Sequence, residues 1–325
     1  MINIKTKAPY FVGCIKAVIF GLTYLFISRL LGKISMFDLL AFRFLFAVIA
    51  FEIARLLHII KIEIKGKKIG GLVFLSALQP IGYYIFETLG VERISTLLCG
   101  VLISAVPLII MVMESIILKE KTNGAQKCFI LLCVGGVLLI SVLSSAGAGG
   151  ATSVLGMLFI LLSMLCEGGY NVLSRKKSAE FSPTEITYIM MWISALVFNG
   201  INVAIHLKNG TIGSYFTPLL DVSCLGPLLY LGVAASFLAY ILYNYMLSKI
   251  QASSVGVFAG ISTIVTVLSG VFLNHEHFFW YHAVGMLCII LGVWGTNYFK
   301  FYDSQQHMME DEIYREQFEN KELRG

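Results

Sequence analysis

The sequence predicts an all-α membrane protein whose ten transmembrane helices form two inverted repeats of five helices. Composition is the first reason: 58% of the 325 residues are hydrophobic, only 13% are charged, and the mean hydropathy is +0.83. A soluble domain of this size needs more charge on its surface, so a soluble enzyme core is excluded. The second reason is a series of apolar segments of membrane-crossing length, and the third is a weak internal repeat.

Each apolar segment is about 20 residues long, which is enough for a helix to cross about 30 Å of hydrocarbon. The first segment is too long for a signal peptide and lacks a small-residue cleavage site, so we expect a retained helix. The ten predicted spans are residues 9–30, 37–56, 69–90, 95–118, 124–143, 153–174, 184–206, 224–248, 252–273 and 279–299.

An uncharged loop at residues 144–153 divides the chain into two halves, residues 9–143 and 153–299. Basic residues in the loops indicate the orientation, because Lys and Arg are enriched on the cytoplasmic side of a membrane. If the N-terminus is cytoplasmic, the inner loops hold fourteen Lys and Arg residues and the outer loops hold four. We therefore expect both termini in the cytoplasm, with the acidic stretch at residues 300–325 as a solvated cytoplasmic tail.

The internal repeat is the reason for expecting inversion. After five crossings the second half enters the membrane from the opposite side, so two homologous halves would be inverted relative to each other, as in many secondary transporters. The matches have weight because they occupy equivalent places in equivalent helices. A shift of 156 residues aligns Tyr84 with Tyr240, Gly100 with Gly256, Glu120 with Glu276 and Gly136 with Gly292, and shifts of 146 and 147 align Tyr24 with Tyr170 and Asp38 with Glu185.

Four short motifs point to a known family. They are FRF at residues 42–44, LGVERIST at 89–96 followed by Pro107, LKEK at 118–121, and its counterpart LNHEH at 273–277. In their order and spacing, the sequence resembles the ten-helix EamA-type members of the drug/metabolite transporter superfamily. The resemblance covers residues 9–299, and the chain departs from the family pattern at His275, at His277 and in its longer acidic tail.

The resemblance implies transport of small metabolites, amino acids, nucleotide sugars or drugs. It also implies a central cavity surrounded by helices 1–4 and 6–9, with helices 5 and 10 at the periphery, where they would pair two copies as a homodimer. We expect the protein in the inner membrane of a bacterial cell. Its expected partners are a small-molecule substrate and the lipid bilayer, and no nucleic acid.

Six of the ionisable residues within the predicted spans are candidates for a role, because a charge in a span is usually functional or paired. On the outer side, Arg43 and Glu87 differ by about 4 Å in depth on consecutive antiparallel helices, and we predict that they contact each other. On the inner side we predict that Lys16 pairs with Glu167 or with Glu114 to close a gate. The alternative is that both sets are ion pairs that only fix helix packing. The sixth residue, also on the inner side, is Glu52.

Tyrosines and amides form a second group of candidates. Gln79, Tyr83 and Glu87 recur at i, i+4 and i+8, so one face of the third span is polar. Tyr84 and Tyr240 lie several turns from any membrane boundary and fit a cavity wall better than an interfacial belt. The predicted substrate-binding and coupling residues are Tyr24, Arg43, Gln79, Tyr83, Tyr84, Glu87, Asn171, Tyr240 and Asn244.

No metal site and no cofactor are expected. The seven cysteines are scattered without a CxxC pair, which indicates apolar fillers. The stretch NHEH at residues 274–277, together with His282, has metal-ligand types but no zinc-binding spacing, so an acidic turn that starts a helix is the better interpretation. The sequence also lacks a Gly-rich phosphate loop and an ordered nucleophile, histidine and acid, which argues against an enzyme.

We therefore predict a secondary active transporter that exports small metabolites such as amino acids by alternating access. A nucleotide-sugar or sugar-phosphate exchanger is the alternative, ranked lower because only Lys16 and Arg43 could face an anion within the spans. A membrane receptor or scaffold that transports nothing is the alternative from another class. We hypothesise that Glu87 exchanges a proton when the cavity changes sides; its alternative roles are binding a substrate amine or fixing the structure.

Overall fold

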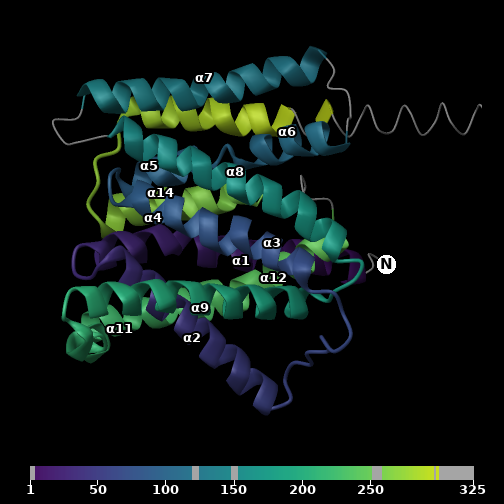
Figure 1. Cartoon of the computed structure of the whole chain (residues 1–325). Coiled ribbons are helices and arrows are strands. Elements are labelled where there is room, and N and C mark those ends of the chain that lie inside the picture. Colours follow the sequence, from purple (N-terminus) through teal and green to yellow (C-terminus); the bar gives the residue numbers. More distant parts are fainter. Residues whose placement is uncertain (1–3, 119–123, 148–152, 251–257, 296–297, 300–325) are drawn as a thin grey trace, which may run out of the picture.

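The computed structural model describes residues 4–118, 124–147, 153–250, 258–295 and 298–299. Within these ranges the chain is all-helical and contains no strand. Figure 1 shows the helices lying alongside one another in a bundle. By length and composition, six of the described helices, counted across their breaks, are suited to crossing a membrane, and three shorter helices are also apolar.

Several helices begin at a serine side-chain cap. The Ser35 and Ser182 hydroxyls each accept a hydrogen bond from the backbone N–H three residues later, on Asp38 and Glu185, and so satisfy a free donor of the first turn. Both acids also lie in the first turn, where a negative charge is favourable. The uninterrupted helices are α1 (Ile4–Leu31), α2 (Met36–Leu56), α7 (Gly124–Gly147), α8 (Val154–Lys177), α9 (Pro183–Lys208), α14 (Ala259–Leu273) and a final helix at Trp280–Gly295.

Three of the predicted spans are interrupted. The third consists of α3 (Gly70–Ser76), the π-helical η1 (Ala77–Gly82) and α4 (Tyr83–Val91). The fourth is split into α5 (Thr96–Ile103) and α6 (Val106–Leu118). The eighth consists of α11 (Val222–Leu229), the π-helical η3 (Tyr230–Leu238) and α12 (Ala239–Lys249), after the short elements η2 (Ile212–Ser214) and α10 (Thr217–Leu220).

A proline accompanies each break. Gln79 has an extended backbone (φ −144°, ψ 123°), and the bond from it to Pro80 is cis. Pro107 follows the gap between α5 and α6, and Pro227 lies in α11, three residues before η3. Proline has no N–H to donate, and its ring clashes with the carbonyl group four residues earlier, so the regular hydrogen bonding is lost nearby. The third, fourth and eighth predicted spans are therefore not single regular helices.

The helices pack mainly between the two halves of the sequence. α1 contacts α14 and α12, α4 and α6 contact α8, and α5 contacts α14. α7 lies beside the final helix at one edge of the bundle (Figure 1). This approach depends on glycine, because a Cβ atom on Gly136 would lie 2.7 Å from the Gly285 carbonyl oxygen, and one on Gly292 would lie 2.7 Å from Cys133 Cβ.

α2 packs along α9, and polar contacts join α9 to the start of α2 and to the segment that follows α2. At the start of α2, the Asp38 carboxylate lies 2.9 Å from Asn202 Nδ2 and 3.0 Å from His206 Nε2. At the start of α9, the Glu185 carboxylate lies 2.7 Å from the Nζ atom of Lys67, which lies in the segment between α2 and α3. These contacts position α2 against the rest of the bundle.

Several predicted features lie outside the described residues. They are the acidic tail at residues 300–325, most of the loop that divides the halves (148–152), the Lys119–Lys121 part of LKEK, and the start of the ninth span, including Gly256.

Candidate functional site

A cavity with an empty volume of about 510 Å³, including the part open to solvent, lies among α1, η1, α4, α5, α6, α8, α12 and α14. Eight residues predicted from the sequence line it: Lys16, Tyr24, Gln79, Tyr83, Tyr84, Glu87, Glu167 and Tyr240. Five further lining residues were not predicted. Two of them, Phe20 and Thr23, follow Lys16 by four and seven residues and so lie on the same face of α1. The other three are Ile103, Val106 and Ser262.

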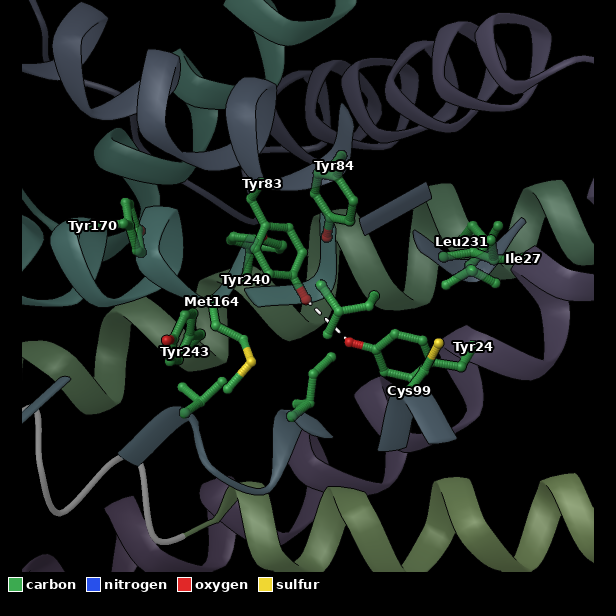
Figure 2. Close-up of a cluster of buried hydrophobic side chains, with 14 of the residues drawn as sticks. Tyr24, Ile27, Tyr83, Tyr84, Cys99, Met164, Tyr170, Leu231, Tyr240 and Tyr243 are labelled. Carbon is green, nitrogen blue, oxygen red and sulfur yellow. Dashed lines mark hydrogen bonds between the residues drawn. The ribbon is translucent and has the colours of Figure 1, made fainter. Parts of the chain in front are cut away.

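Glu87, on α4, is held by a chain of hydroxyl groups. Tyr83 donates a hydrogen bond of 2.7 Å to Glu87 Oε1. The Tyr24 and Tyr83 hydroxyl oxygens lie 3.1 Å apart and point toward each other in Figure 2. Because the Tyr83 hydrogen goes to Glu87, Tyr24 must be the donor to Tyr83. The chain fixes one carboxylate oxygen, while the other, Oε2, is buried and has no hydrogen-bond partner.

Arg43, on α2, is completely buried and does not form the predicted contact with Glu87. It donates to Ser236 Oγ (2.9 Å) and to the Tyr84 hydroxyl (2.8 Å), and its guanidinium carbon lies 4.0 Å from the centre of the Tyr84 ring. No ion pair joins Arg43 and Glu87 in the described part of the chain. The prediction of a direct Arg43–Glu87 contact is therefore wrong for this conformation. The Tyr84 ring covers one face of the Arg43 guanidinium, and the Tyr84 hydroxyl accepts one of its hydrogen bonds.

Gln79 and Tyr240 meet across the cavity from the two halves of the chain. Gln79 Nε2 donates a hydrogen bond of 2.7 Å to the Tyr240 hydroxyl, whereas Gln79 Oε1 is buried without a partner. The break at η1 gives this geometry, since Gln79 has left the helical conformation that Tyr83 and Glu87 share. The predicted polar face is thus present, but its first member is placed by the helix break.

Lys16 does not contact Glu167 directly. Its ammonium nitrogen lies 4.2 Å from the centre of the Tyr243 ring and 4.8 Å from that of Phe20. The Tyr243 hydroxyl, in turn, lies 3.0 Å from Glu167 Oε1. The predicted ion pair is therefore replaced here by an aromatic ring that contacts both groups. The side chain of Glu114, the other predicted partner, lies outside the described residues.

The two asparagines belong to packing networks next to the cavity. Asn244 Oδ1 accepts hydrogen bonds from Tyr170 and Ser174, and its Nδ2 donates to Thr187, so it joins α8, α9 and α12. Asn171 Oδ1 lies 2.7 Å from the Tyr243 hydroxyl. Neither asparagine lines the cavity, although both were predicted to bind substrate.

Glu52 lies away from the cavity, on the surface between α2 and α9. Its carboxylate forms an ion pair of 2.6 Å with Arg55 and accepts hydrogen bonds from Tyr188 (2.7 Å) and Trp192 (3.1 Å). This arrangement matches the structural alternative for Glu52, which fixes helix packing.

The stretch after α14 has a role that the sequence did not reveal. Glu276 accepts hydrogen bonds from the backbone N–H groups of Thr96 (3.0 Å) and Leu97 (2.7 Å), at the start of α5. Asn274 Nδ2 lies 3.0 Å from Ser28 Oγ, and Arg29 donates to the Leu273 carbonyl (2.7 Å). A carboxylate at a helix N-terminus is favourable, so these contacts fasten α1, α5 and α14 together at one end of the bundle.

Comparison with known proteins agrees with this architecture. A model of the EamA-like transporter family matches the chain in two stretches, residues 7–142 and 154–298. The chain belongs to the EamA-like transporter family. Large apolar side chains such as Leu131, Leu138 and Val142 on α7 are exposed, which suits contact with lipid. With its apolar helices, this member of the family is an integral membrane protein.

The relatives of this EamA-family chain are themselves named only as transporters. The uncharacterized transporter YcxC of Bacillus subtilis (strain 168) is 35% identical over 297 residues, which cover 91% of this chain and 95% of that protein. An uncharacterized transporter of Archaeoglobus fulgidus is 24% identical, with coverage of 71% and 79%. A protein crystal structure has the same fold, with a TM-score of 0.63 at 16% identity, over 89% of this chain and 96% of that one.

Proposed function

We propose that this protein is a secondary active transporter that exports small polar metabolites such as amino acids by alternating access. The observation that carries this proposal is the position of the cavity. Its lining residues come from α1, η1, α4, α5 and α6 in the first half, residues 9–143, and from α8, α12 and α14 in the second half, residues 153–299. A site between two halves can open to either side of the membrane when one half rocks against the other.

The matching helix breaks support two inverted repeats of five helices. Adding 156 to the bounds of η1, residues 77–82, gives 233–238, which falls within η3 (Tyr230–Leu238). The family matches at residues 7–142 and 154–298 have nearly the same limits as the two proposed halves. A π-helical break is a rare feature, so its recurrence at this shift adds to the weak sequence repeat.

The contact between α7 and the final helix has the same symmetry. A Cβ atom on Gly136 would meet the Gly285 carbonyl oxygen at 2.7 Å and Ile289 Cγ1 at 3.1 Å. One on Gly292 would meet the Phe129 carbonyl oxygen at 2.8 Å and Cys133 at 2.7 Å. At a shift of 156 residues, Phe129 corresponds to Gly285 and Cys133 corresponds to Ile289. The two glycines, which correspond to each other, therefore face corresponding residues on the opposite helix. The outer faces of these two helices are the proposed contact with lipid or with a second copy of the chain.

The fastened ends of α1, α5 and α14 support closure of the cavity at one end. With both termini in the cytoplasm, as the distribution of basic residues favours, the Glu276 end is the outer one, in a bacterial inner membrane. Lys16, Tyr243 and Glu167 would then form part of the inner gate, where the Lys16–Glu167 contact is made and lost as the halves move.

Amino-acid-like substrates fit the lining better than nucleotide sugars do. Among the described lining residues, Glu87 and Glu167 are acidic and Lys16 is basic. A sugar nucleotide carries phosphate charges that call for several Lys or Arg side chains, and Lys16 is the one basic residue among the described lining residues. Arg43 does not line the cavity; it donates to Ser236 and Tyr84 and keeps one buried donor, Nη1, without a partner. The arrangement therefore favours a substrate that brings a positive group as well as a negative one.

An untargeted comparison of metabolites inside and outside cells, with and without this protein, tests the proposal. Export predicts that a set of small polar compounds rises outside and falls inside when the protein is made. An unchanged distribution of solutes would favour a receptor or scaffold. Loss of a compound together with the appearance of a new product would indicate an enzyme, which is a different class of function.

A further inference from the structure

Two hydrogen-bond acceptors in the cavity have no partner. Glu87 Oε2 and Gln79 Oε1 are both buried, their residues are 1% and 2% exposed, and both residues line the same cavity. Leaving a buried acceptor unpaired is unfavourable, and more so for a carboxylate oxygen. Such atoms in a cavity indicate where a ligand donates hydrogen bonds.

The protein holds both groups in place through their other polar atom. Tyr83 donates to Glu87 Oε1, and Gln79 Nε2 donates to Tyr240. Each side chain is thereby oriented without being satisfied. The surrounding wall is aromatic, with Tyr24 and Tyr84 beside these two tyrosines. Aromatic faces attract cations, so the wall and the free acceptors favour the same kind of ligand group.

The charges near Glu87 leave room for a ligand cation. Arg43 donates from Nε to Ser236 and from Nη2 to Tyr84, its Nη1 is buried without a hydrogen-bond partner, and its guanidinium lies over the face of Tyr84. Lys16 lies over Tyr243, whose hydroxyl contacts Glu167. In the described structure neither cation forms an ion pair with Glu87.

We propose that Glu87 and Gln79 bind an N–H-bearing ammonium group of the transported molecule. The proposal rests on the proposed function only in taking the ligand to be the transported molecule. A primary ammonium offers three N–H donors and a positive charge, which match the free acceptors and the aromatic side chains of the cavity wall. A quaternary ammonium has the same charge but no N–H, so it would leave both acceptors unpaired. A carboxylate or phosphate would place a second negative charge beside Glu87.

Three probes of similar shape separate these chemistries on the purified full-length protein. They are 2-phenylethylammonium, its N,N,N-trimethyl analogue, and 3-phenylpropionate, with binding measured by titration calorimetry in lipid nanodiscs. We expect the primary ammonium to bind about tenfold or more tightly than the trimethyl analogue, because a charge-assisted hydrogen bond is lost. The phenylpropionate should bind weakest.

Equal or tighter binding of the trimethyl analogue would mean an aromatic cage without hydrogen bonding and would overturn the proposal. Tightest binding of phenylpropionate, or no binding of any probe at millimolar concentration, would overturn it as well. These comparisons use the wild-type protein, so their outcome does not depend on whether a variant folds.

Variants then assign the site. Glu87→Gln should weaken the binding of 2-phenylethylammonium about tenfold or more. It should also reduce the ratio between the affinities for 2-phenylethylammonium and for its trimethyl analogue. Glu92→Gln, one turn further on at the exposed end of α4, is the matched control and should bind as the wild type does, since Glu92 pairs with Arg93 at the surface. An unchanged affinity in a folded Glu87→Gln protein would contradict the assignment.

A further comparison identifies the source of the ammonium group. Phenylalanine carries the same amine together with a carboxylate that could reach Lys16. Tighter binding of phenylalanine than of 2-phenylethylammonium would support amino acids, and the reverse would support simple amines; both results support the ammonium site. If the probes bind with this selectivity but reconstituted protein moves no solute, the proposed function fails and the site stands. If the protein transports a solute but does not bind ammonium probes selectively, the proposed ammonium site is wrong and the proposed transport function stands.

Discussion

The broken helices of the two halves, α3–η1–α4 and α11–η3–α12, have related backbones but bring different side chains to the cavity. At a shift of 156 residues, Tyr84 corresponds to Tyr240, and both line the cavity. Glu87 corresponds to Tyr243, and Gln79 corresponds to Ala235. The first half therefore supplies both unpaired acceptors, whereas Tyr240 alone among these three counterparts in the second half lines the cavity. In the proposed repeat, the two halves share a π-helical break, whereas the residues proposed to bind the substrate lie in one half.

The pair of positions next to Glu87 and Tyr243 differs in the same direction. Thr88 Oγ1 is buried without a partner, whereas its counterpart Asn244 is bonded to Tyr170, Ser174 and Thr187. One half thus keeps free polar atoms next to the cavity, and the other uses the corresponding position to join three helices. This difference gives matched variants that can break or sharpen the comparison.

The largest effect is expected at Glu87. Glu87→Gln should lower export at limiting substrate by about 10- to 100-fold, because a charged hydrogen bond to the substrate is lost. The counterpart change Tyr243→Phe, which removes a neutral hydroxyl, should lower it by less than about tenfold. Export of the metabolite identified in cells, assayed in proteoliposomes, measures both.

The same assay with and without an imposed pH gradient tests proton coupling. If Glu87 also exchanges the coupling proton, the residual transport by Glu87→Gln should not respond to the gradient, whereas Tyr243→Phe should still respond. Full gradient-driven accumulation by Glu87→Gln would contradict the coupling role.

A large loss of stability is expected at Asn244. Asn244→Leu leaves the buried hydroxyls of Tyr170, Ser174 and Thr187 without this partner, so we expect a loss of about 3 kcal/mol or more in the free energy of unfolding. Thr88→Val removes a hydroxyl that has no partner and should change stability by less than about 0.5 kcal/mol. Thermal unfolding of the purified proteins in detergent compares the two. Equal destabilisation would contradict the difference between the two halves.

A smaller and symmetric effect is expected where α7 meets the final helix. Gly136→Ala and Gly292→Ala each place a methyl group within 3 Å of the facing helix, so each should destabilise by about 1–3 kcal/mol. Gly135→Ala, next to an open space on α7, is the control and should be neutral or slightly stabilising. If only one of the two glycines tolerates alanine, the helices do not pack symmetrically.

Much of the helical architecture could be predicted because apolar segments of about 20 residues have few alternatives in a membrane. The cavity face of α4 could be predicted as well, since Tyr83 and Glu87 lie one helical turn apart. The lengths of the π-helical segments η1 and η3 could not be predicted from the sequence. Pro80 and Pro227 show where a backbone hydrogen bond is missing, but not how the neighbouring helices accommodate that loss.

The side-chain partners were harder to predict than the helices. Depth in the membrane placed Arg43 near Glu87 and Lys16 near Glu167, yet a tyrosine ring lies against the cation in both cases. Similar depth says nothing about what lies between two side chains, and that depends on rotamers set by packing across helices. Asn244 was predicted to line the cavity because it lies among tyrosines and amides at related positions in the spans, whereas its hydrogen bonds to Ser174 and Thr187 make it a packing contact of α12 with α8 and α9.

Accessibility of the cavity from both sides of the membrane tests alternating access most directly. In a protein whose seven native cysteines are replaced, Thr23→Cys places one thiol in the cavity wall, while Lys65→Cys and Thr211→Cys mark the proposed inner and outer loops. A membrane-impermeant maleimide added to one side at a time should label Lys65→Cys only from the cytoplasm and Thr211→Cys only from outside. Thr23→Cys should react from either side as the cavity alternates. Labelling of Thr23→Cys from one side only would contradict alternating access, and labelling of both loop positions from the same side would contradict the inverted repeats.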